Sequence, residues 1–236
     1  MNVVVIESTF RGPSRSGNGG YSAGLLASTA HPEGAAVEVT LRQPPPLETP
    51  LNVVDGELRS AEAEAGATIA TSRQVTFEDD PIDPVSFVEA KQAEARYGGL
   101  AGHPFPYCFG CGTSRTDGDG LCLRPGPIGD GRAACTWVPH QAFARGDSPS
   151  VPVVWAALDC SGGWTADVTG RPCVLGRMTA QIDALPVTGE RCVVMGRMLN
   201  EDGRKLFTAS TLYDETGRVL GRAKHVWITV DPSAFE

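Results

Sequence analysis

The chain has 236 residues and a formal net charge of −8, with 41% hydrophobic and 20% charged residues. These proportions are ordinary for a globular protein, and negative charge without basic clusters argues against a nucleic-acid partner. No apolar run approaches the ~20 residues that span a bilayer, and the start MNVVVIESTF lacks the basic region of a signal peptide. Seven cysteines in no compact framework favour reduced thiols, so we expect a cytoplasmic protein without membrane insertion.

The first 77 residues predict one strand, one helix and then several further strands. Asn18 is a good N-cap for a helix over residues 19–30, which the following His-Pro pair ends because proline disfavours helix before itself. Strands are predicted from β-branched and alternating runs at 2–6, 36–42, 51–55 and 58–75. The last run is long enough for two strands around a turn near Ala65 and Gly66.

Residues 78–119 read as a linker. The stretch EDDPIDPVSF is acidic and broken by prolines, and the later part of the segment is rich in glycine. Residues 88–97 predict a short exposed helix. We expect the segment to lie over the surface, ordered in part by Phe105, Tyr107 and Phe109.

The second half of the chain, residues 120–236, repeats the order of the first. Strand-like runs precede a helix over 150–168, whose apolar residues recur at three- and four-residue steps and which should loosen at the glycine pair 162–163. The predicted strands lie at 120–124, 132–138, 173–182, 191–199, 205–213 and 218–230. This repetition predicts an internal duplication of one α+β unit, with domains at 1–77 and 120–236.

Two motifs carry a resemblance to a known superfamily. CFGCG at 108–112 followed by GL at 120–121 is similar to the CFxCGxxNPxGL opening of many thioesterase-superfamily domains, although TSRTDGDG stands here where that opening has an NP-containing turn. The LD of WAALDCSGGWTA resembles the helix signature in which such enzymes carry an acidic residue. In the first half, GNGG stands where single-domain relatives have His-Gly-Gly.

This resemblance implies the hot-dog fold of acyl-CoA thioesterases and dehydratases. The chain would be two tandem hot-dog domains, each a long helix wrapped by an antiparallel sheet, packed as a pseudo-dimer. In the family the active site lies between two units, with the helix start from one and the acid from the other. The expected substrate is an acyl-CoA, with coenzyme A as part of the substrate and no other cofactor.

Thioester hydrolysis needs donors for the developing oxyanion and a group that activates water or attacks directly. The amides of Gly19 and Gly20 at a helix N-terminus meet the first need, and the carboxylate of Asp159 meets the second as base or nucleophile. The first helix contains no acid and the second starts without a Gly-Gly pair, so one composite site per chain is expected. The alternatives are a structural hydrogen bond for Asp159 and mere close packing for the glycines.

Further residues are candidates for substrate contacts, each with a structural alternative. Asn18 contacts substrate or only caps the helix. Two aromatic residues line an acyl tunnel or fill the core. A histidine on the loop before the second helix would be a second polar group near the site. Two arginines flank the Gly-rich entry and would bind the CoA nucleotide or remain solvated. These candidates are Tyr21, Trp155, His140, Arg11 and Arg15.

Cys108 and Cys111 have the spacing of one half of a zinc site, but a second CxxC or a close pair of histidines is missing. His103, Cys122 and His140 are conceivable completions in no recognised pattern. We therefore expect no metal and interpret the two cysteines as a structural thiol pair.

Two other functions compete with an acyl-CoA thioesterase. A non-catalytic acyl-CoA or fatty-acyl binding protein would share the tunnel without needing Asp159 at a carbonyl. An enoyl-CoA hydratase of the same fold ranks lower, because no Asp/His dyad lies at suitable spacing near either helix. A homodimer of tandem units is expected, since open sheet edges commonly close through another copy.

Overall fold

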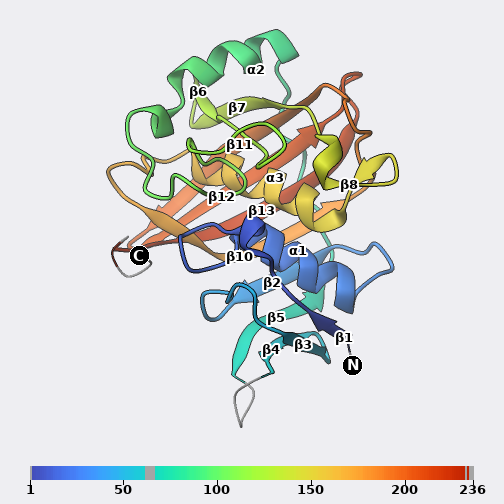
Figure 1. Ribbon diagram of the computed structural model, residues 1–236. Coiled ribbons are helices and arrows are strands. Elements are labelled where there is room, and N and C mark those ends of the chain that lie inside the picture. Colours follow the sequence, from blue (N-terminus) through green and yellow to red (C-terminus); the bar gives the residue numbers. More distant parts are fainter. Residues whose placement is uncertain (1, 62–66, 232, 234–236) are drawn as a thin grey trace.

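Two helices lie side by side against one face of a large antiparallel sheet in the computed structural model, which describes residues 2–61, 67–231 and 233 (Figure 1). They are α1 (Gly19–Ala30) and α3 (Val151–Gly163). A Cβ atom at Gly24 of α1 would lie 2.7 Å from the Trp155 Cβ of α3, so only glycine permits this close approach. None of the helices in the described ranges is long and apolar enough to cross a membrane.

Eleven strands of the described residues form this sheet, in the order β1-β3-β4-β5-β2-β10-β13-β12-β11-β7-β6. The strands are β1 (Asn2–Val4), β2 (Val37–Leu41), β3 (Leu51–Val54), β4 (Glu57–Ser60), β5 (Thr68–Gln74), β6 (Gly126–Gly129), β7 (Arg132–Trp137), β10 (Cys173–Ile182), β11 (Cys192–Asp202), β12 (Lys205–Tyr213) and β13 (Val219–Thr229). A separate ribbon pairs β8 (Ala144–Arg145) with β9 (Ser148–Pro149). A short helix, α2 (Phe87–Ala93), lies near the β6–β7 end.

The same strand order occurs on both sides of the pair β2–β10, where Val39 lies opposite Met178. On one side the sheet continues β2-β5-β4-β3-β1, and on the other it continues β10-β13-β12-β11-β7. In each half the first strand after the helix lies at the join, and the last strand of this sheet before the helix lies farthest from the join among the five strands. The extra edge strand β6 has no equivalent among the described residues of the first half.

Burial follows the predicted patterns. Val37 and Val39 of β2 are buried and alternate with partly exposed residues, as expected for a strand with one covered face. The helix α3 is buried nearly all round, from Pro152 to Gly163, because the sheet covers one side, α1 another, and loop residues near Phe109 a third. A helix that is apolar on every face is therefore expected here.

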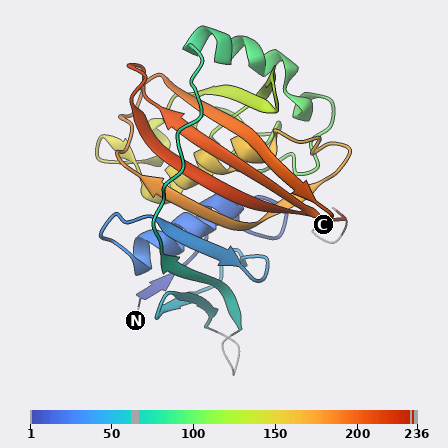
Figure 2. The same cartoon turned by 180° about the vertical axis from the view of Figure 1, so that it is seen from behind.

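The predicted linker, residues 78–119, divides into two parts with different surroundings. Its first part runs across the outer face of the sheet (Figure 2) and is held there by bonds such as Lys224 Nζ to Asp79 Oδ1 at 2.7 Å and Ile82 N–H to Thr211 Oγ1 at 3.1 Å. The end of the segment does not lie over the surface as expected. Cys108 and Phe109 are buried in the main core.

One predicted strand and the predicted end of one helix are wrong. Residues 120–124 form no strand, because Cys122 adopts a left-handed conformation (φ 52°) that breaks a ladder, and the next strand begins at Gly126. The helix predicted over 150–168 ends at Gly163, where the glycine pair was expected to loosen it. The turn expected near Ala65 and Gly66 lies outside the described residues.

Candidate active site

The start of α1 and the middle of α3 meet at a buried hydrogen bond. The Gly20 N–H donates to Asp159 Oδ2 at 2.9 Å, across 139 residues of sequence. The contact requires glycine, since a Cβ atom at position 20 would lie 2.4 Å from Asp159 Cβ and 2.8 Å from the Trp155 carbonyl oxygen. The Gly20 amide and the Asp159 carboxyl group, predicted as site groups from separate halves of the chain, are therefore in direct contact.

The N–H groups of the first turn of α1, which have no partner within the helix, differ in their hydrogen-bond acceptors. The Asn18 side chain accepts from the Tyr21 N–H at 2.8 Å and so caps the helix. The Gly20 N–H is taken by Asp159, whereas the Gly19 N–H has no acceptor among the described residues. A free amide at the positive end of a helix is a ready donor for an oxyanion.

The carboxyl group of Asp159 is only 2% exposed. Burial raises its pKa to about 8, and the hydrogen bond from Gly20 opposes this shift only in part. Its second oxygen, Oδ1, is buried without a hydrogen-bond partner among the described residues. An unsatisfied buried oxygen is uncommon in a folded protein and calls for a ligand or water at this position.

Asp159 and Gly19 line a cavity of about 240 Å³. Its wall is mostly apolar, and the first residues of β10, the end of β13 and the loop after α3 contribute to it. Leu175, Val174, Trp227, Ile228, Trp164 and Val168 are among these residues. The exposed residues Arg42 and Gln43 belong to the same lining and place a cation at the cavity. An apolar cavity with a few convergent polar groups is typical of a small-molecule site.

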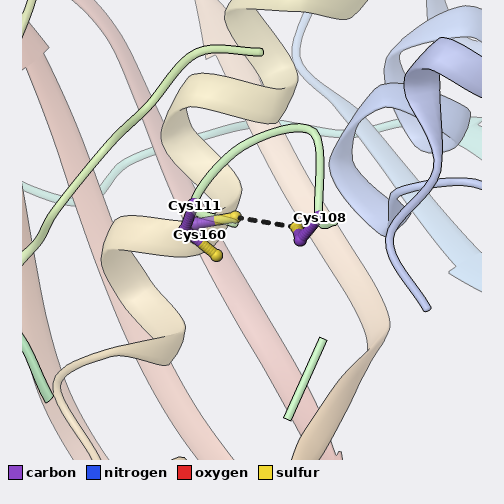
Figure 3. A group of neighbouring side chains, drawn as sticks. All are labelled: Cys108, Cys111 and Cys160. Atoms are coloured by element: carbon purple, nitrogen blue, oxygen red, sulfur yellow. Dashed lines mark hydrogen bonds between the residues drawn. The ribbon is translucent and has the colours of Figure 1, made fainter. Parts of the chain in front are cut away.

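Three thiols form part of the same cavity wall (Figure 3). Cys108 and Cys111 come from the glycine-rich turn and Cys160 follows Asp159 in α3. All three are buried and free of disulfides. Hydrogen bonds from the other two thiols hold the pKa of Cys108 well below its usual value. Burial raises the pKa of Cys111, and hydrogen bonds with Cys108 and Cys111, together with burial, raise the pKa of Cys160.

Asn18 also lines this cavity, whereas the remaining candidate residues for substrate contacts do not. The Tyr21 ring stacks on Phe10 with centroids 3.8 Å apart, and Trp155 is buried against Gly24 of α1 and lines a second cavity instead. His140 is exposed and accepts from the Ala142 N–H at 3.1 Å, which makes it a local cap. Of the two arginines, one lies over the Tyr107 ring at 5.6 Å and the other is exposed; these are Arg11 and Arg15, respectively.

Sequence reasoning missed Cys160, Arg42 and His103 as members of the site. His103 was considered only as a metal ligand, and the structure places its Nε2 3.2 Å from Cys111 Sγ. A signal for Cys160 exists, because it directly follows the nominated Asp159 in one helix. No sequence signal marks Arg42, which reaches the cavity through the pairing of β2 with β10.

No protein-family model matches the sequence, and no curated protein matches it. Among solved structures, a putative thioesterase from Novosphingobium aromaticivorans is similar with a TM-score of 0.61 at 14% identity, over 97% of this chain and 95% of that chain. The thioesterase superfamily protein RHA08564 has a TM-score of 0.42 at 16% identity, over 46% of this chain and 54% of that one, so this chain spans about half its length. The protein smu.793 from Streptococcus mutans, bound to acetyl CoA, has a TM-score of 0.42 at 11% identity, over 46% and 88%. The chain therefore has the hot-dog, thioesterase-like fold that its sequence motifs resemble.

Proposed function

We propose that this chain hydrolyses acyl-CoA thioesters at a composite site between α1 and α3. The observation that carries the proposal is the bond from the Gly20 N–H to Asp159 Oδ2 at 2.9 Å, made at the wall of an apolar cavity. It fixes an acid next to an unoccupied helix amide, which is the pair of groups that thioester hydrolysis needs. The fold shared with a putative thioesterase supports the same reaction class.

We further propose that the two halves are hot-dog units packed as a pseudo-dimer with one working site. The equal strand order on both sides of β2–β10 supports this arrangement. Asp159 is the ninth residue of α3, and the ninth residue of α1 is Ala27. Ala27 lines a second cavity together with Val151, the first residue of α3. The second cavity thus has an alanine and a valine where the first has an aspartate and a glycine, and we assign no hydrolysis to it.

The reaction follows from the positions of these groups. The thioester carbonyl oxygen accepts from the Gly19 N–H, which polarises the carbonyl carbon. Asp159, oriented through Oδ2 by Gly20, takes a proton from water with Oδ1 as the oxygen attacks that carbon. The C–S bond of the tetrahedral intermediate then breaks, and the proton held by Asp159 passes to the departing CoA sulfur. Direct attack by Asp159 on the carbonyl is the alternative first step, and it leads to an anhydride that water hydrolyses.

The anionic part of CoA needs a cation on a chain of net charge −8. Arg42 is exposed and belongs to the cavity lining, so it fits this task better than Arg11 or Arg15, which do not line the cavity. The apolar wall formed by Leu175 and its neighbours would take the acyl group.

A panel of acyl-CoA esters assayed for free-thiol release tests the proposal. The wild-type chain should hydrolyse at least one ester, and Asp159→Asn should lower its turnover by roughly 10²-fold or more with the fold intact. Asp167→Asn is the matched control, because Asp167 is an exposed carboxylate just after α3. Saturable binding of several esters without thiol release would instead favour a binding protein. Unchanged turnover in Asp159→Asn would remove this residue from the mechanism.

A further inference from the structure

The three thiols of the cavity wall converge on one point. The Sγ atoms of Cys108, Cys111 and Cys160 all lie within 4.8 Å of one another, and those of Cys108 and Cys160 are 3.9 Å apart (Figure 3). All three side chains are buried.

The turn that carries Cys108 and Cys111 is built to reach α3. It is closed by the Gly112 N–H, which donates to the Cys108 carbonyl oxygen at 2.9 Å. A Cβ atom at Gly112 would lie 2.5 Å from the Pro106 carbonyl oxygen, and one at Gly110 would lie 2.5 Å from Cys160 Sγ. Both glycines are therefore needed to bring two thiols of a C-x-x-C turn against the third.

Nitrogen donors surround the sulfur atoms. The indole N–H of Trp164 donates to Cys111 Sγ at 3.3 Å, and His103 Nε2 lies 3.2 Å from the same atom. Because the Phe105 N–H donates to His103 Nδ1 at 2.9 Å, the proton of the neutral ring is on Nε2 and points at Cys111. The Asn18 amide reaches Cys108 Sγ at 3.6 Å and Cys160 Sγ at 4.0 Å.

Such a shell fits sulfur that carries negative charge. A neutral thiol is a weak hydrogen-bond acceptor, so the four N–H contacts to these three sulfur atoms would be weak if all three were thiols. Hydrogen bonds to a charged thiolate are stronger. Outer-shell N–H donors are typical of metal sites, where they orient the ligands and tune the ion. The C-x-x-C spacing is also that of zinc sites.

We propose that Cys108, Cys111 and Cys160 bind a Zn²⁺ ion as three thiolates. Tetrahedral zinc with Zn–S bonds of ~2.3 Å separates its sulfur ligands by about 3.8 Å, close to the 3.9 Å between Cys108 and Cys160. No other His, Cys, Asp or Glu ligand atom among the described residues joins the three, and His103 has its Nδ1 engaged and its Nε2–H directed at sulfur.

The fourth position of the ion is therefore not filled by a side chain of the described part of the chain. Since all three cysteines line the cavity, this position is left to water or a ligand within it. The zinc site does not depend on the thioesterase proposal. Because the three cysteines and Asp159 line the same cavity, a bound ion would lie in the wall of that cavity.

Metal analysis of the full chain, purified from zinc-supplemented cells under reducing conditions without chelator, tests the site. The wild-type chain should carry roughly one zinc ion. Cys108→Ser, Cys111→Ser and Cys160→Ser should each lower the bound zinc at least about 10-fold. Cys135→Ser should retain it, because Cys135 is equally buried but bonds the Ser161 hydroxyl at 3.6 Å, outside the cluster.

Two measurements keep the test decisive if a serine variant fails to fold. Titration of the chelator-treated wild-type chain with Co²⁺ should give thiolate-to-metal charge-transfer absorption. Trp164→Phe keeps all three ligands, loses one N–H donor to Cys111 and should weaken zinc binding by about 10-fold. A wild-type chain without zinc and without the Co²⁺ absorption would overturn the proposal.

Discussion

Gly20→Ala is the substitution that probes the contact between the two helices most specifically. The added methyl group would lie 2.4 Å from Asp159 Cβ and 2.8 Å from the Trp155 carbonyl oxygen, so α1 and α3 must separate at this point. The bond from the Gly20 N–H to Asp159 Oδ2, now 2.9 Å, would then lengthen or break. The carboxylate would lose the donor that orients it.

The size of both effects can be worked out from these contacts. Overpacking costs about 1–3 kcal/mol and loss of the hydrogen bond about 1 kcal/mol, while alanine in a helix restores up to about 1 kcal/mol. The free energy of unfolding should therefore fall by about 1–3 kcal/mol. Displacement of a reacting group by about 1 Å lowers turnover by roughly 10²-fold.

Gly24→Ala is the matched control, one turn further along α1. Its methyl group would lie 2.7 Å from Trp155 Cβ and 2.8 Å from Pro152 Cα, so it separates the same helices at a similar cost in stability. It touches neither oxygen of Asp159. Denaturant unfolding and thiol release measured on both variants should show two comparable losses of stability and a large loss of turnover in Gly20→Ala alone. Equal losses of turnover in both variants would refute the reasoning.

Three further predictions concern other parts of the molecule. Burial lowers the pKa of His225 to about 3, so the unfolded chain binds a proton at this side chain near pH 6.5 and the folded chain does not. The free energy of unfolding should therefore fall by about 1.4 kcal/mol per pH unit between about pH 6.5 and about pH 3. His225→Gln should remove this part of the pH dependence, as measured by urea unfolding. Phe109→Ala empties a fully buried site that packs edge-on against Phe10 and should lower the free energy of unfolding by about 3–5 kcal/mol, which chemical denaturation would measure; a loss below 1 kcal/mol would contradict the burial. Arg42→Ala should raise the KM for an acyl-CoA roughly two- to fivefold at low salt with kcat unchanged, and an equal effect at high salt would speak against a charge interaction.

Local signals explain why the first helix could be predicted with its observed bounds. Asn18 caps it, a His-Pro pair follows it, and α1 extends over Gly19–Ala30 as expected. The strand predicted at 120–124 fails for a reason that periodicity does not detect. The apolar residues there are buried by loop packing, since the Leu121 and Leu123 N–H groups donate to the Phe109 and Gly110 carbonyl oxygens.

Only those parts of the candidate site that a local stretch of sequence identifies could be predicted. Two glycines at a helix start and one acid within a helix can be read from the sequence, and the fold brings the Gly20 nitrogen to 2.9 Å from Asp159 Oδ2. Cys160 joins Cys108 and Cys111 only through the tertiary fold, because 52 residues separate it from Cys108 in the sequence. No spacing rule for zinc sites covers such a separation. Long-range packing also keeps Tyr21 and Trp155 in the core and out of the cavity wall beside Asp159.

A double-variant cycle on Gly20→Ala and Asp159→Asn tests the central claim most directly. If Gly20 acts by holding Asp159, the double variant should turn over an acyl-CoA no more slowly than the worse single variant, a loss of roughly 10²-fold. Additive losses, approaching roughly 10⁴-fold in the double variant, would mean that the two residues act independently and would contradict a single composite site.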